Sequence, residues 1–90
     1  MRTELENDCR IILESRGYYP ARLTYGFFPT LLAAHGNYPA VFIHFGPSQK
    51  QAEARQIENL RQTWNLVVAT VETTGDLTDF LDKHERAFRR

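Results

Sequence analysis

The sequence lacks several features that identify a protein class. Only one cysteine, Cys9, occurs among the 90 residues, so no internal disulfide can form and a secreted, disulfide-stapled domain is excluded. No apolar run is long enough to cross a membrane, and charged residues interrupt the N-terminus from Arg2 onward, where a signal peptide would be apolar. We therefore expect a cytoplasmic (intracellular) protein that has no membrane partner.

A net charge is also lacking. Eleven basic residues balance eleven acidic ones, so the formal net charge is zero. Proteins that hold DNA through its phosphates carry an excess of Lys and Arg, and a DNA mimic carries the opposite excess. The balance argues against both classes and favours a protein partner over free DNA. It also removes the long-range repulsion that would oppose a homodimer.

What remains is the composition of one small globular domain. Hydrophobic residues make up 42% and charged residues 24%, as is usual for soluble proteins. Ninety residues leave no room for a second domain, and neither a repeat nor a linker interrupts them. We therefore expect a single domain over residues 1–90.

The strongest local pattern is the apolar run from Val41 to Phe45, broken only by His44. Pro39 closes the run on one side and Gly46-Pro47 on the other. A short apolar run between turn residues is typical of a strand that is buried on both faces. We expect this strand to be central and the other elements to pack around it.

Three elements are predicted before the central strand. A helix covers Thr3–Arg16, where Thr3 and Glu6 have the spacing of a capping box and Gly17 provides the C-cap. A strand with Pro20 at an edge covers Tyr18–Tyr25, and its alternation predicts an apolar face made of Tyr19, Ala21, Leu23 and Tyr25. A further apolar run covers Phe27–Ala34, and His35-Gly36-Asn37 supplies a hairpin turn.

Three more elements follow it. A polar helix is expected over Ser48–Trp64, a strand over Leu66–Val71, and a helix from a cap at Asp76 to Phe88. A strand, a helix and a strand in succession predict a parallel crossover. The fold class is therefore α/β (α+β), in the order α-β-β-β-α-β-α, with a mixed four-stranded sheet flanked by helices.

This order resembles the core of the PD-(D/E)xK nuclease superfamily, and most of all its small VRR-NUC branch, which includes stand-alone phage proteins. The similarity spans most of the chain. It includes an early acid in the first helix (Glu4 or Glu6), Gly17-Tyr18 and Arg22 at the first strand, and Pro29 opening the second. A Gln-rich helix after the central strand and the segment Leu77–Leu81 also fit. The resemblance implies a restriction-endonuclease-like core.

The catalytic motif of that superfamily is degenerate here. The family places an Asp just after the Pro, an acid in the central strand and a Lys two residues further on. These positions hold Thr30, His44 and Gly46. Two carboxylates hold Mg²⁺ through hard oxygen ligands, and the metal then activates water. Threonine is a poor ligand and histidine prefers softer metals, so the resemblance implies an inert domain without a cofactor.

Two functions follow from this pattern. The first is a catalytically inert, nuclease-like binding module: a phage or mobile-element accessory protein that docks on a host protein or nucleoprotein complex, for example as a defence-system inhibitor. The alternative is a small metal-dependent endonuclease with a migrated active site. Its residues would be Glu6, His44 and Lys50, with Mg²⁺ or Mn²⁺ as cofactor. If His44 has no catalytic role, it is a hydrogen-bonded histidine of the core or of a sheet face.

Candidate binding residues form two groups. An aromatic and basic group on the first strand comprises Tyr18, Tyr19, Arg22 and Tyr25, and a basic C-terminal group comprises Arg86, Arg89 and Arg90. Exposed rings could stack on nucleic-acid bases or serve as anchors for a protein partner, and the arginines could contact phosphates. The alternatives are that the rings fill a small core and that the arginines stabilise a helix C-terminus. An exposed edge at Tyr18–Tyr25 could also pair with its own copy in a homodimer.

Overall fold

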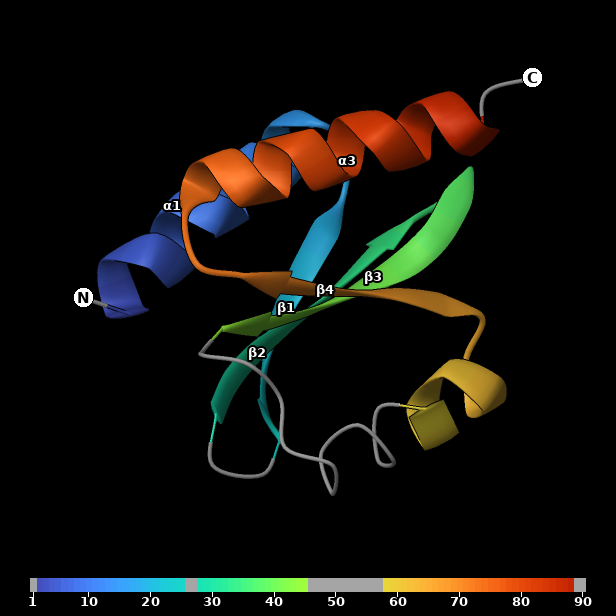
Figure 1. Cartoon of the computed structure of the whole chain (residues 1–90), viewed down its shortest axis with the longest axis horizontal. Helices are drawn as coiled ribbons and strands as arrows, with labels where there is room; N and C mark the ends of the chain where they lie inside the picture. The colour runs from blue at the N-terminus through green and yellow to red at the C-terminus, as the bar shows by residue number, and fades with distance from the viewer. Residues whose placement is uncertain (1, 26–27, 46–57, 89–90) are drawn as a thin grey trace.

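A computed structural model describes residues 2–25, 28–45 and 58–88 of the chain. The fold is α+β, and its order agrees with the predicted α-β-β-β-α-β-α (Figure 1). Residues 58–63 are helical, and the earlier part of the helix predicted over Ser48–Trp64 lies outside the described residues. The other elements are α1 (Arg2–Ser15), β1 (Tyr19–Tyr25), β2 (Phe28–His35), β3 (Tyr38–Phe45), β4 (Leu66–Val71) and α3 (Thr74–Phe88).

The four strands form one mixed sheet in the order β1-β2-β3-β4. β1 pairs antiparallel with β2, and β2 antiparallel with β3. β3 and β4 are parallel neighbours, as the predicted crossover requires, with Ala40 opposite Leu66 and Phe45 opposite Val71. The sheet thus ends at β1 on one side and at β4 on the other.

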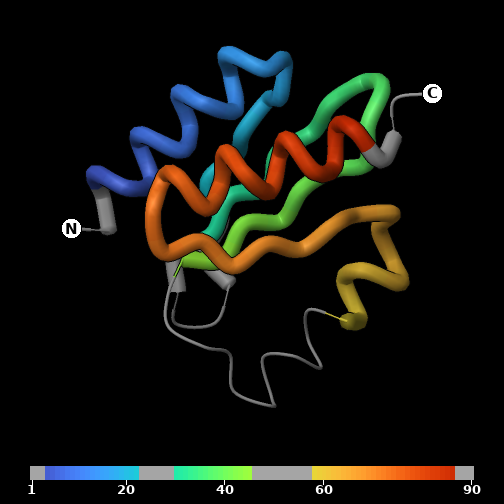
Figure 2. The backbone as a smooth tube through the Cα atoms, turned by 45° about the horizontal axis from the view of Figure 1, so that its top comes forward, coloured from blue at the N-terminus to red at the C-terminus, as the bar shows by residue number. Residues whose placement is uncertain are grey.

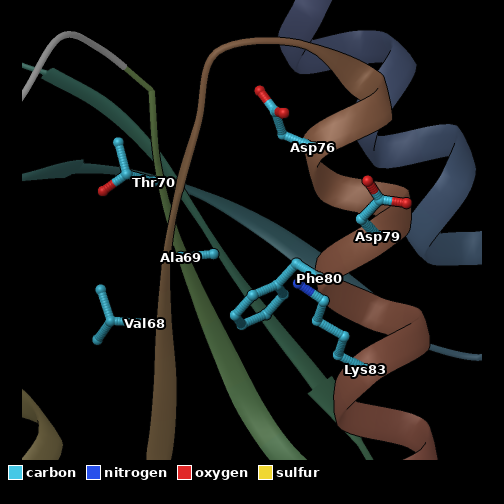
Figure 3. A pocket seen from close by; sticks show the side chains of 7 residues that line it. All are labelled: Val68, Ala69, Thr70, Asp76, Asp79, Phe80 and Lys83. Atoms are coloured by element: carbon cyan, nitrogen blue, oxygen red, sulfur yellow. The ribbon is translucent and has the colours of Figure 1, made fainter.

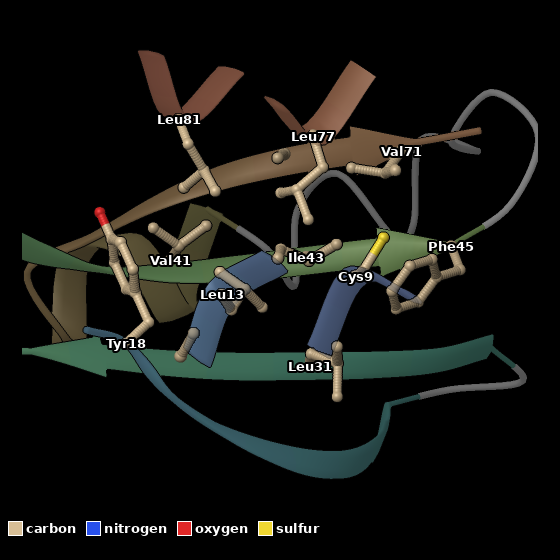
Figure 4. Close-up of a cluster of buried hydrophobic side chains, with 12 residues drawn as sticks. Cys9, Leu13, Tyr18, Leu31, Val41, Ile43, Phe45, Val71, Leu77 and Leu81 are labelled. Carbon is tan, nitrogen blue, oxygen red and sulfur yellow. The ribbon is translucent and has the colours of Figure 1, made fainter. Parts of the chain in front are cut away.

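The two faces of the sheet are covered differently. α1 and α3 lie side by side on one face, and residues 58–63 lie on the other (Figures 1 and 2). The helix-covered face holds the main core, in which Cys9 and Leu13 of α1 and Leu77 and Leu81 of α3 meet Ile43 of β3 (Figure 4). The opposite face has a smaller cluster, where the only fully buried members among the described residues are Phe42 and Leu66.

β3 is the centre of the fold, as predicted. All five residues from Val41 to Phe45 are buried. Because successive side chains of a strand point to opposite faces, burial of the whole run requires cover on both sides. Ile43 accordingly packs in the main core while its neighbour Phe42 packs in the smaller cluster.

The end of α1 follows from one glycine. Gly17 has φ +87°, the left-handed conformation that favours glycine. Its N–H donates to the Glu14 carbonyl at 3.1 Å, and the Tyr18 N–H donates to the Leu13 carbonyl at 2.9 Å. These two bonds form a Schellman motif, so the predicted C-cap is confirmed. Tyr18 and Leu13 are also both buried, which supplies the hydrophobic contact that usually accompanies the motif.

Three local predictions are corrected. α1 begins at Arg2, so Thr3 lies inside the helix and is not its N-cap. α3 begins at Thr74, and its cap is Thr73: the Asp76 N–H donates to Thr73 Oγ1 at 3.3 Å, and the Thr73 N–H donates to Asp76 Oδ2 at 3.1 Å. β1 begins at Tyr19 and not at Tyr18, and its face predicted to be apolar is exposed at Tyr19 and Ala21.

Candidate functional site

The positions at which the resemblance expects acids form a polar row across the sheet. Thr30 of β2 is opposite His44 of β3, and His44 is opposite Thr70 of β4. Their strand neighbours Leu31 and Ile43 pack against the helices, so the row lies on the other face, away from α1 and α3. Thr30 and His44 are 0% and 1% exposed. The two inner positions of the row are therefore enclosed, and neither carries a carboxylate.

Glu6, the first candidate acid of the migrated site, lies on the helix-covered side. Its carboxylate is almost fully buried, and Oε1 lies 3.0 Å from Nε of Arg22 on β1. The side chain of Arg22 is 64% exposed, so the guanidinium contacts the buried acid from the solvent side, at the edge of the sheet. This ion pair fastens α1 to β1 and gives Glu6 a structural role. It also occupies Arg22, one of the candidate binding residues.

The structure does not bring Glu6 and His44 together, because they lie on opposite faces of the sheet. Lys50, the third residue of that site, and Gly46 lie outside the described residues. Across residues 2–25, 28–45 and 58–88, no group of three or more His, Cys, Asp and Glu side chains is placed to hold a metal ion.

Tyr18 is a core residue and not part of a binding surface. It is 2% exposed, and its ring meets that of His35 edge-on with 4.9 Å between centroids. His35 in turn packs against Tyr38 at 4.5 Å. Burial raises the pKa of the Tyr18 phenol, and the nearby Glu85 carboxylate adds to this. The expectation that Tyr18 is available for stacking is thus corrected, because the Schellman motif turns the side chain inward.

The other candidate binding residues are spread over the molecule. Tyr19 is 78% exposed on the sheet face that α1 and α3 leave open. Arg86 is exposed in the last turn of α3, on the opposite side of the sheet. The side chain of Tyr25, together with Arg89 and Arg90, falls outside the described part of the chain. Tyr19 and Arg86 therefore do not form one continuous patch.

Cys9 is no candidate nucleophile. Its side chain is fully buried in the main core, and burial, together with the charge of Asp8, raises the pKa of the thiol to about 11. The thiol is therefore protonated at neutral pH, whereas a reactive cysteine needs its thiolate. Cys9 acts as a small apolar side chain, as predicted.

A hollow beside β4 was not predicted from the sequence. It measures about 400 Å³ and lies between the strand and α3 (Figure 3). Its lining comprises Val68, Ala69, Thr70, Asp76, Asp79, Phe80 and Lys83. The one signal in the sequence is the spacing of Asp76, Phe80 and Lys83, which puts them on one stripe of a helix. From the sequence alone, such a stripe is interpreted as a solvent-exposed helix face. The sheet order shows that it lies beside the edge strand β4.

No helix in the described part of the chain is long and apolar enough to span a membrane. Comparisons with models of protein families, with curated proteins and with solved structures found no match to this chain. The likeness to PD-(D/E)xK nucleases therefore depends on the element order and on the residues that carry it. A function has to be argued from the geometry of this chain alone.

Proposed function

We propose that this chain is a binding domain without nuclease activity, which docks on a host protein or nucleoprotein complex. The observation that carries the proposal is the separation of Glu6 and His44 by the sheet, with Thr30 as the neighbour of His44. Metal-dependent phosphodiester hydrolysis needs carboxylates that converge on a shared ion. Here the acid faces an arginine on one side of the sheet, and the row of Thr30, His44 and Thr70 on the other side holds no carboxylate.

Burial supports the same proposal. Thr30 and His44 are enclosed, so a DNA phosphate cannot contact either side chain unless the sheet face is opened. A catalytic group has to lie within hydrogen-bonding reach of the group on which it acts. A buried histidine in the interior of the sheet is the role that this position fits best.

The distribution of charge favours a protein over free DNA as the partner. The net charge is zero, and Arg16, Arg22 and Arg61 are each engaged with a carboxylate. Arginines held in ion pairs release few counterions when DNA approaches, so the electrostatic part of the affinity is small. A small inhibitor from a phage or mobile element that acts on a defence complex in the cytoplasm is the setting that the resemblance suggests.

The test is a cleavage assay on plasmid, single-stranded and branched DNA with Mg²⁺ or Mn²⁺. We expect no metal-dependent cleavage above that of a buffer control. Cleavage that is lost in Glu6→Gln or His44→Ala, while the circular dichroism spectrum is unchanged, would overturn the proposal and establish the endonuclease alternative. The matched control is Glu14→Gln, which removes an exposed acid from the same helix. Metal-dependent cleavage that survives all three changes and co-purifies with the chain would also overturn the proposal, because it would place the catalytic residues elsewhere in the chain.

The preference for a protein partner has a separate test. We expect fluorescence anisotropy with labelled duplex and single-stranded DNA to give dissociation constants no tighter than about 10⁻⁴ M at physiological salt. Binding a hundredfold tighter, with a steep dependence on salt, would contradict that preference. It would leave the absence of catalysis untouched.

A further inference from the structure

The two edges of the sheet differ in how they are protected. At β1, Pro20 has no N–H to offer a further strand, and Arg22 with Glu6 places charges beside the edge. β4, with the sequence Leu66-Val67-Val68-Ala69-Thr70-Val71, contains no proline and no charge. Its pairing with β3 is its only ladder in the described part of the chain. An edge of this kind is a template for another strand.

The hollow lies directly beside this edge. Asp76 and Asp79 lie toward the Thr70 end of β4 and Lys83 toward the Val68 end, because α3 runs back along the strand (Figures 1 and 3). Phe80 lies between these ends, next to Ala69. Asp79 and Lys83 are both exposed, and neither makes an ion pair with another described residue. The rim of the hollow is therefore acidic at one end and basic at the other.

We propose that β4 pairs antiparallel with β4 of a second copy of this chain, about a two-fold axis near Val68 and Ala69. An interface of this symmetry uses the same patch twice, so the patch has to be complementary to itself. The rim meets this condition: the axis reverses the direction of α3, and Asp79 of each copy then faces Lys83 of the other. The two Phe80 rings meet at the axis and fill the hollow, and the sheet continues across both copies.

A second copy suits the edge better than a basic peptide does. Asp76 and Asp79 would attract basic side chains at one end of the hollow, but Lys83 would repel them at the other, whereas a copy supplies both signs at the matching ends. The zero net charge leaves no long-range repulsion between copies. The proposal moves the expected homodimer contact from Tyr18–Tyr25 to Leu66–Val71, and it does not depend on the proposed function.

Sedimentation equilibrium over a wide range of protein concentrations tests the proposal. We expect a monomer–dimer equilibrium in the native chain. Asp79→Lys or Lys83→Asp alone turns two attractions into two repulsions, and should weaken the dimer by about tenfold or more. The double variant Asp79→Lys/Lys83→Asp restores both contacts and should recover most of the loss. Asp8→Lys, which makes the same charge change on an exposed position of α1, should have no such effect.

Circular dichroism tests whether each variant is folded. We expect that it is, because the side chains of Asp79 and Lys83 are exposed. A further variant, Thr70→Lys, puts a charge on the edge itself at an exposed side chain, and should also favour the monomer. A chain that stays monomeric at every concentration would overturn the proposal. So would a dimer that neither single charge change weakens, or one whose double variant is as weak as the single variants.

Discussion

At the scale of single residues, three of the positions named for the nuclease resemblance, Glu6, Thr30 and His44, are buried within the fold. The sequence alone showed that Thr30 and Gly46 lack the expected acid and lysine. It could not show that Glu6 is buried against Arg22, because this contact depends on how α1 lies across the sheet edge. Of the two interpretations of His44, its burial agrees with that of a core histidine in an otherwise apolar central strand.

The Glu6–Arg22 ion pair gives a prediction about stability. Arg22→Ala removes the partner of a buried carboxylate, and we expect the free energy of unfolding to fall by about 1–2 kcal/mol, the cost of an uncompensated buried polar group. The exposed side of Arg22 keeps this loss below that of a fully buried pair. Urea denaturation followed by circular dichroism measures the change.

A second ion pair provides the matched control. Nη1 of Arg61 lies 2.9 Å from Oε2 of Glu58, but both side chains are about half exposed. Arg61→Ala should therefore lower the free energy of unfolding by no more than about 0.5 kcal/mol. In a Glu6→Gln background, Arg22→Ala should lose most of its effect, because no buried charge remains to be matched. Equal losses for Arg22→Ala and Arg61→Ala would show that Glu6 does not need its partner.

At the scale of elements, patterns within one segment and the parallel neighbours β3 and β4 were predicted well, whereas contacts between individual side chains of different segments were not. The apolar run at Val41–Phe45 determined the central strand, and Gly17 determined the end of α1, because both signals are local. The alternation of β1 predicted an apolar face but left open which face is exposed. Alternation shows which residues share a face, but it does not show which face the helices cover. Tyr18 is buried because it belongs to the helix cap and not to the strand.

Two glycines of this fold should respond in opposite directions to alanine. Gly17→Ala forces a left-handed residue with a Cβ 3.1 Å from Nε2 of His35, so we expect a loss of about 1–2 kcal/mol or more. Gly75 lies in the first turn of α3, where the nearest atom to an added Cβ is 3.7 Å away, Oγ1 of Thr73. There alanine should stabilise the chain by about 0.5 kcal/mol. Chemical denaturation of the two variants side by side is the measurement, and a similar loss in both would refute the role given to the Gly17 conformation.

At the scale of the whole molecule, the sheet is covered unequally, and this decides which surfaces remain for partners. α1 and α3 bury the main core on one face, whereas the described cover of the other face leaves Tyr19 and Trp64 exposed. The position of β4 at an edge of the described sheet follows from the predicted hairpin and parallel crossover. The hollow beside β4 depends on the path of α3 along the strand, which the periodicity of a single segment does not contain, so it could not be predicted from the sequence.

The unequal cover predicts how two leucines differ in their contribution to stability. Leu77 of α3 is fully buried in the main core, and Leu77→Ala should cost about 2–5 kcal/mol. A domain of this size has a total stability of about 5–13 kcal/mol, so the variant should be close to unfolding. Leu60 is only half-buried over the smaller cluster, and Leu60→Ala should cost about 1 kcal/mol. Thermal and urea unfolding of the two variants will compare the faces directly. If Leu60→Ala proves as damaging as Leu77→Ala, the face away from α1 and α3 carries as much of the core as the covered one, and little of it is left for a partner.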